Sequence, residues 1–200
     1  MPVSRSPKVL KGALVRLDDQ GAGAPARVVF QYNPEKLHRR LEERSSGPPR
    51  EIITCSLVLD ATDALEFPDN NPAVVEHGIY PTLAALELLM HQREAPGGGS
   101  SWWPFWPFGS GSEVEQEPVL IFLWGDQRAV PVQLTRLDIT EEQHDPELHP
   151  IRANVRLRMR VVTDQDVPGG HRGARLWREH LSRMRTLTRG VYAAAPPVRI

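Results

Sequence analysis

The sequence contains almost no cysteine: Cys55 is its single thiol among 200 residues. One cysteine excludes an internal disulfide framework and a multi-cysteine zinc site. Because Cys55 lies in the strand-like run EIITCSLVLD, we expect it to be a small buried hydrophobic residue rather than a nucleophile. A hydrophobic core must therefore hold the fold together, and 200 residues with 40% apolar composition are enough to build one.

The sequence also lacks a long apolar run and an excess of charge of either sign. No window approaches the ~18 apolar residues that span a bilayer, and the amino terminus has no apolar segment of signal-peptide length. The 24 basic and 25 acidic residues give a formal net charge of −1, so no general attraction for nucleic acid or anionic membranes is expected. We therefore expect a cytoplasmic protein without a nucleic-acid partner and without membrane insertion.

Recognisable catalytic motifs are missing as well. The sequence has no phosphate-binding glycine loop before a helix and no G-x-S-x-G elbow. His144 and His149 lie in a proline-containing loop without a third spaced ligand, which argues against a metal site. Asp60 and Asp63 follow a strand and are interpreted as turn formers. These absences predict a protein that is not an enzyme and has no cofactor.

Short runs rich in valine, leucine and isoleucine, separated by turns that contain glycine and proline, predict a strand-rich domain. The runs span residues 9–17, 27–32, 51–60, 118–125, 128–140 and 153–162. The first two runs predict one hairpin, and the fourth and fifth predict another. A change in the phase of the apolar residues predicts a bulge near Thr135 and Arg136. The charged segment 35–50 is expected to be an exposed excursion between strands.

Two segments show helical spacing. After the polar turn FPDNNP, the run IYPTLAALELLMH places leucines three residues apart and Pro81 in the first turn, which predicts a helix that flanks the strands. Near the carboxyl terminus, Trp177, Leu181 and Met184 recur at spacings of four and three among arginines. We expect a C-terminal helix that packs on the body or docks on a partner. The chain is accordingly divided into a domain at residues 1–165 and a helix with a tail at residues 166–200.

A loop insertion at residues 96–113 combines glycine and serine flanks with a strongly aromatic centre. Large amphipathic rings anchor interfaces, so the loop is interpreted either as folded over a groove of its own domain or as a docking loop for a partner. Membrane insertion is the least favoured interpretation, because the patch is short and lacks basic flanks. The aromatic residues are Trp102, Trp103, Phe105, Trp106 and Phe108.

The run ANVRLRMRVV at residues 153–162 alternates without a break between apolar and polar residues. Such alternation predicts a strand with one face on the core. Its polar face carries Arg156, Arg158 and Arg160, and Arg152 lies one step upstream. Residues on the same face of a strand are roughly 7 Å apart, so these arginines repel one another unless carboxylates or water compensate them.

Several stretches, taken together and in this order, resemble the tube-type domain of phage-tail-like contractile injection systems. They are KGALVRL, RVVFQYNPEKLHRRLE, TCSLVLDATD, GIYPTLAALELL, PVLIFLWG and PVQLTRLDITEEQHDPELHPIRANVRLRMRVVTD. The similarity covers roughly residues 8–165. It is greatest to the adaptor proteins that join the spike hub and baseplate to the inner tube, a family that usually carries a C-terminal LysM domain. Residues 166–200 are too few for that domain and a linker, so the terminal helix or the aromatic loop is expected to replace its contact.

The resemblance implies a mainly β (α+β) fold: a small antiparallel barrel of two packed sheets of the Hcp-like tube type, with one flanking helix. It also implies a structural protein that forms a homohexameric ring within a particle assembled in the cytoplasm. Its partners would be the inner-tube protein, the spike hub protein, and baseplate or sheath proteins. Two alternatives stay open, namely an ordinary stacking inner-tube subunit and an unrelated small β-barrel module that binds a ligand.

Two interpretations of the arginine face also stay open. In the first, the face is solvated and paired across strands, with Asp138, Glu141 and Glu142 of the hairpin partner as the carboxylates. In the second, which the resemblance suggests, Arg156, Arg158 and Arg160 line the channel or meet an acidic face of the next ring. Sixfold repetition would then produce a strong local field from a nearly neutral monomer.

Overall fold

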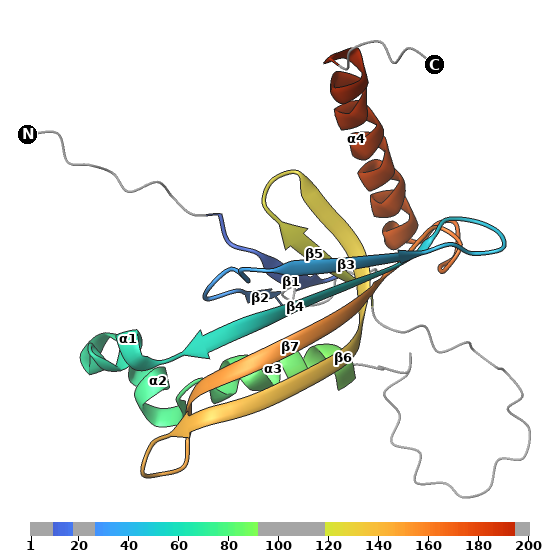
Figure 1. Ribbon diagram of the computed structural model, residues 1–200. Helices are drawn as coiled ribbons and strands as arrows, with labels where there is room; N and C mark the ends of the chain where they lie inside the picture. Colours follow the sequence, from blue (N-terminus) through green and yellow to red (C-terminus); the bar gives the residue numbers. More distant parts are fainter. Residues whose placement is uncertain (1–9, 18–26, 92–118, 195–200) are drawn as a thin grey trace, which may run out of the picture.

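The computed structural model describes residues 10–17, 27–91 and 119–194. The protein is a mainly β α+β fold built on one antiparallel sheet, with a few short helices and a C-terminal helix (Figure 1). The aromatic loop, with Trp102, Trp103, Phe105, Trp106 and Phe108, lies outside the described residues.

The sheet has seven strands in the order β2-β1-β5-β6-β7-β4-β3. All neighbouring strands are antiparallel. Both predicted hairpins, β1 with β2 and β5 with β6, are confirmed. The register shift between Leu134 and Arg136 confirms the predicted bulge. The strands are β1 Ala13–Arg16, β2 Arg27–Val29, β3 Leu37–Glu42, β4 Arg50–Asp60, β5 Leu120–Trp124, β6 Arg128–His144 and β7 Pro150–Val161.

The sheet is not closed into a barrel, so that part of the predicted fold is wrong. Within the described residues, no ladder joins the two edge strands β2 and β3. Closure requires matched, staggered edges, but β2 has only 3 residues and β3 has 6. The side-chain amide of Gln31, just after β2, instead donates to the Asp60 carbonyl at 2.6 Å and accepts from the Asp60 N–H at 2.9 Å. One side chain therefore holds the end of β2 to the end of β4, the neighbour of the other edge strand.

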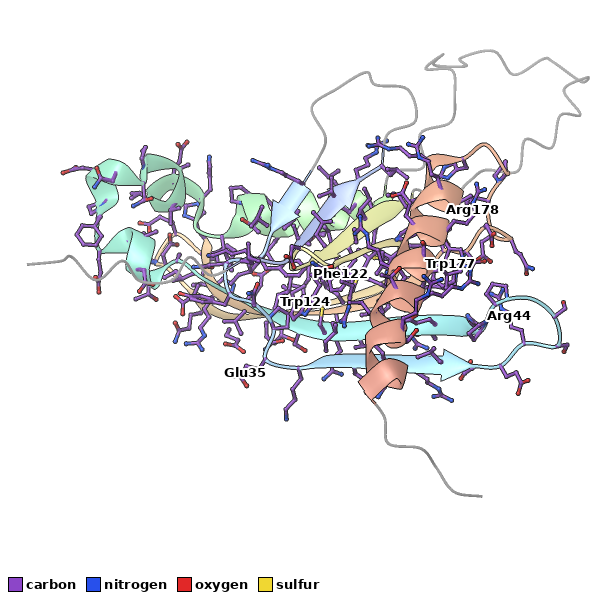
Figure 2. All side chains as sticks on the ribbon, turned by 90° about the horizontal axis from the view of Figure 1, so that it is seen from above. Glu35, Arg44, Phe122, Trp124, Trp177 and Arg178 are labelled. Atoms are coloured by element: carbon purple, nitrogen blue, oxygen red, sulfur yellow. The ribbon has the colours of Figure 1, made fainter. Side chains whose placement is uncertain are left out.

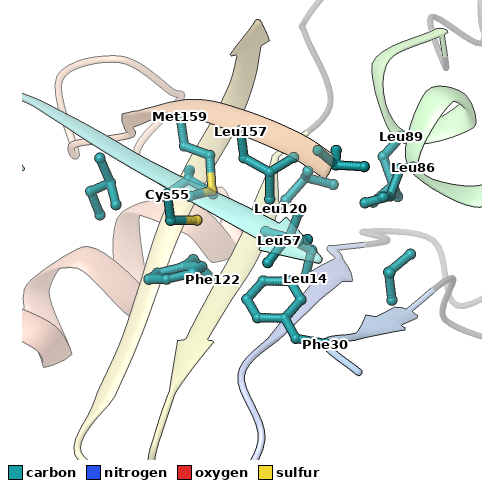
Figure 3. Packing of buried hydrophobic residues seen from close by; sticks show 14 of the residues in the cluster. Leu14, Phe30, Cys55, Leu57, Leu86, Leu89, Leu120, Phe122, Leu157 and Met159 are labelled. Atoms are coloured by element: carbon teal, nitrogen blue, oxygen red, sulfur yellow. The ribbon is translucent and has the colours of Figure 1, made fainter. Parts of the chain in front are cut away.

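The two packed sheets of the prediction are one continuous sheet that curls around its own core (Figure 3). Phe30, which follows β2, and Phe122 of β5 have ring centroids 6.3 Å apart. Both belong to the same hydrophobic cluster as Leu57 of β4 and Leu157 of β7. Cys55 lies in this cluster, which confirms that it is a buried hydrophobic residue, and burial raises the pKa of its thiol to about 12.

Helix α3, Tyr80–His91, confirms the helix expected from the leucine spacing. It inserts Leu83, Leu86 and Leu89 into the core cluster. Three shorter helical segments precede it, where the sequence indicated only a polar turn: α1 Thr62–Leu65, η1 Pro68–Asn70 and α2 Pro72–His77. Backbone bonds from Ala61 to Ile151 and from Ile79 to Pro150 fasten this region to the start of β7.

Strand β3 was not predicted from the sequence, because its residues lie within the segment expected to be an exposed excursion. β3 is an edge strand whose side chains are half-buried or exposed, so an apolar alternation is absent. Its inward Arg39 is compensated by the buried carboxylate of Glu51 on β4. A charged residue on the core side removes the pattern by which strands are recognised.

Helix α4, Arg172–Ala194, packs through its first half only. Ala174, Trp177 and His180 are buried, whereas residues 185–190 are all exposed. In Figure 1 the helix rises away from the sheet toward the carboxyl terminus. The C-terminal helix thus contributes Trp177 to the domain core while its second half projects.

We expect Leu157→Ala to lower the free energy of unfolding by about 2–5 kcal/mol, because Leu157 is fully buried at the centre of the sheet. The neighbouring Arg158→Ala is the matched control, since its side chain is exposed and a change of about 0.5 kcal/mol or less is expected. Urea unfolding followed by circular dichroism measures both. Equal losses in the two variants would contradict this assignment of the faces.

Candidate functional site

The outward face of β7 is the candidate site. β7 lies between β6 and β4, and its inward residues Ala153, Val155, Leu157 and Met159 have no solvent exposure. Because side chains alternate along a strand, this burial directs the arginines to the opposite face of the sheet. The four candidate residues are Arg152, Arg156, Arg158 and Arg160.

The two arginines at the ends of this row are paired. Arg152 lies 3.6 Å from a carboxylate oxygen of Asp60 and 3.2 Å from one of Glu142. Arg160 donates to the amide oxygen of Gln133 and lies 3.2 Å from Asp166. These contacts join β7 to neighbouring parts of the fold, so Arg152 and Arg160 have a structural role.

Asp166 also joins two parts of the fold that are distant in sequence. Arg44 belongs to the β3–β4 connection (Figure 2). It lies 3.7 Å from the Asp166 carboxylate that Arg160 also contacts. Burial alone would raise the pKa of Asp166, but hydrogen bonds from Thr163 and the charges of Arg160 and Arg44 lower it overall. Asp166 therefore stays ionised and holds the β3–β4 connection against the end of β7.

The two central arginines, Arg156 and Arg158, are exposed, and neither forms an ion pair within the described part of the chain. Asp138 is the cross-strand neighbour of Arg156, but both of its oxygens accept from the Arg136 Nε at 2.9 Å. Arg158 stands opposite Arg136, so two cations face each other across the β6–β7 ladder. Like charges in this position are unfavourable.

Of the three carboxylates expected to pair with the arginine face, one does so. Glu142 pairs with Arg152, whereas Glu141 contacts His144 at 2.9 Å and Asp138 is occupied by Arg136. The centre of the face is left with positive charge that its own strands do not neutralise. This charge favours an anionic surface or ligand as its neighbour.

An open groove of about 760 Å³ lies beside Arg156. It runs between the segment around Glu35, which Figure 2 places at the rim of the sheet, and strands β4 and β7. Lys36 and Arg156 contribute positive charge to its wall, Glu35 contributes a carboxylate, and Thr54 contributes a hydroxyl. In the described chain, no group of three or more His, Cys, Asp or Glu residues is placed to hold a metal ion.

A second polar cluster lies beneath the packed half of α4. The rings of Trp177 and His180 are 5.9 Å apart, and the ion pair of Arg39 with Glu51 lies close enough to influence His180. Burial lowers the pKa of His180, Glu51 opposes this effect, and Arg39, Arg128 and Arg183 add to it. His180 is therefore neutral at the junction between α4 and the sheet.

The three residues expected on a docking helix differ in their contacts. Trp177 is 4% exposed and belongs to the core, and Leu181 is half-buried against it. Met184 is half-buried at the point where the helix leaves the body. Trp177 and Leu181 thus attach α4 to its own domain, and the continuously exposed part of the helix begins only beyond them.

We expect the stability of the protein to decrease on acidification, in part through His180. Because folding lowers its pKa, the folded state binds fewer protons than the unfolded chain. The stabilising contribution is complete above the unfolded pKa of about 6.5 and is lost as the pH falls below it. Urea unfolding at about pH 7.5 and about pH 5.5 should show a smaller pH dependence in His180→Gln than in the wild type. Thr188→Ala, at an exposed position of the same helix without an ionisable side chain, should retain the wild-type dependence; equal dependence in all three proteins would contradict the assignment.

Comparison of the chain with models of known protein families finds no match, and comparison with characterised proteins finds none. Of the helices in the described ranges, none combines the length and apolar character needed to cross a membrane.

Proposed function

We propose that this protein is a non-enzymatic structural component of a phage-tail-like contractile injection system. In this role it forms a ring that connects the spike hub and baseplate to the inner tube and provides a template for tube assembly. Support comes from the ordered sequence resemblance over residues 8–165 and from the antiparallel sheet with α3 against its core.

The observation that carries the proposal is the pair Arg156 and Arg158, which no carboxylate among the described residues neutralises, on a sheet face that leads to an edge strand. Two strands away from these arginines lies the edge strand β3, which is paired on one side only within the described residues. An edge strand offers unpaired backbone N–H and C=O groups to another chain. A charged face next to such an edge suits contact with a neighbouring subunit better than it suits catalysis.

The mechanism of such a protein is geometric. A contact that uses different surfaces of two identical subunits closes into a ring when the rotation between them allows it. In a homohexamer, the arginines would line the channel or meet an acidic face of the next ring. The ring then presents one surface to the spike hub and another to the inner-tube protein, while baseplate or sheath proteins contact its outside. Assembly in the cytoplasm fits these partners.

The groove beside Arg156 favours a second candidate function, a binding module for an anionic ligand. A module of this kind would act as a monomer. An ordinary stacking inner-tube subunit is the further alternative within the same class of particle, and it would polymerise without other components.

Light scattering of the purified full-length protein tests the proposal. We expect a mass six times that of the 22.5 kDa chain, and ring-shaped particles in electron micrographs. Long tubes formed by the protein alone would favour the stacking subunit, and a stable monomer would overturn the proposal.

We further expect the double variant Arg156→Glu, Arg158→Glu to fold normally but to lose the ring, because a reversed charge faces the same neighbour. Circular dichroism and light scattering measure the two effects. The control is Arg172→Glu, Arg175→Glu, which makes the same change in charge on exposed positions of the packed half of α4. Rings that persist in the Arg156→Glu, Arg158→Glu variant would mean that these arginines face solvent and not a neighbouring subunit.

A further inference from the structure

Charge is segregated between two opposite ends of the molecule, although the formal net charge is only −1. Residues 61–80 and residues 141–149 contain no lysine or arginine, and we call these two segments together the acidic end. The bonds from Ala61 and Ile79 to the start of β7 hold them near each other. In Figure 1 the acidic end lies on the other side of the molecule from α4. Its carboxylates are Asp63, Glu66, Asp69, Glu76, Glu141, Glu142, Asp145 and Glu147.

The acidic end combines unpaired charge with exposed apolar surface. Glu66, Asp69 and Glu147 have no ion-pair partner within the described residues. Between and beside them, Phe67 is 61% exposed and Leu148 is 78% exposed. Val75 and Tyr80 add further exposed apolar area. Apolar residues framed by carboxylates are the composition of an interface for a basic amphipathic element.

The opposite end carries such an element in the distal half of α4, residues 183–190. Leu187 is 60% exposed and continues the apolar stripe that begins at Trp177. With about 3.6 residues per turn, Arg183 and Arg185 stand on opposite sides of this stripe. Neither of them, nor Arg189, forms an ion pair in the described chain, and Glu179 is the single acidic residue of the helix. Within the described residues, this part of α4 is therefore an arginine-flanked apolar helix segment that no other element of the chain covers.

We infer that the distal half of α4 lies on the acidic end of a second copy of this chain, the neighbouring subunit of the ring. The charges of the two surfaces are opposite, and each surface has exposed apolar residues for the other to cover. Because the surfaces are at opposite ends of one molecule, the contact joins copies head to tail, as ring closure requires. The inference rests on the proposed function in one respect, because both require that the protein associates with copies of itself.

Charge reversal on either side tests this contact in the full-length protein. Arg185→Glu, Arg189→Glu places carboxylates against the acidic end, and Glu66→Lys, Asp69→Lys places lysines against the arginines. Like charges would then face each other and repel, so each variant alone should associate about 100-fold more weakly than the wild type in light scattering. A mixture of the two variants restores opposite charges at every contact and should form rings again. The control Arg172→Glu, Arg175→Glu should associate like the wild type.

Restored rings in the mixture also show that both variants are folded. A mixture that stays dissociated, or single variants that associate like the wild type, would overturn the inference. In the second case the wild-type rings would still support the proposed function, so the two failures are distinguishable. A wild-type protein that stays monomeric would overturn both. Binding of the distal half to anionic vesicles in place of a second copy would likewise refute the contact.

Discussion

Burial of the inward side chains of β7 is the constraint on which the rest of the structure depends. Val155, Leu157 and Met159 are inaccessible to solvent, and β7 pairs along its length with both β6 and β4. A shift of one residue would exchange the two faces, bringing arginines into the core. The register of the three central strands is therefore strongly determined, and the positions of the charged groups on the outer face follow from it.

Much of the fold could be predicted where local patterns agree with tertiary contacts. The alternation in β4 and β7, the leucine spacing of α3 and the phase change in β6 each reflect one buried face, and each prediction is confirmed. Prediction failed where burial is partial or compensated at long range. The core-facing side of β3 carries Arg39, which is paired with Glu51 and so breaks the apolar pattern. Helices α1 and α2 have no completely buried residue. Closure of the sheet depends on the lengths of β2 and β3, which alternation does not encode.

The candidate site shows the same division. The sequence identified the arginine face and the carboxylates available to it, but not the pairing among them. Asp138 is taken by Arg136, two residues away on its own strand beyond the bulge, rather than by Arg156 across the ladder. Arg160 pairs with Asp166, which follows the turn after the end of β7. Such choices depend on the local geometry of the bulge and of the turn, so composition and spacing do not determine them.

The amide clip between Gln31 and Asp60 has a consequence for the width of the curled sheet. A closed barrel has a diameter fixed by strand number and shear. Here one side chain spans the gap at a single point, and away from that point, within the described residues, no ladder fixes the separation of the two margins; the packing of the enclosed residues, among them Phe30 and Phe122, influences it instead. The width of the curled sheet therefore depends on how its core is packed. Exchange of a few interior side chains can change this width without adding or removing a strand.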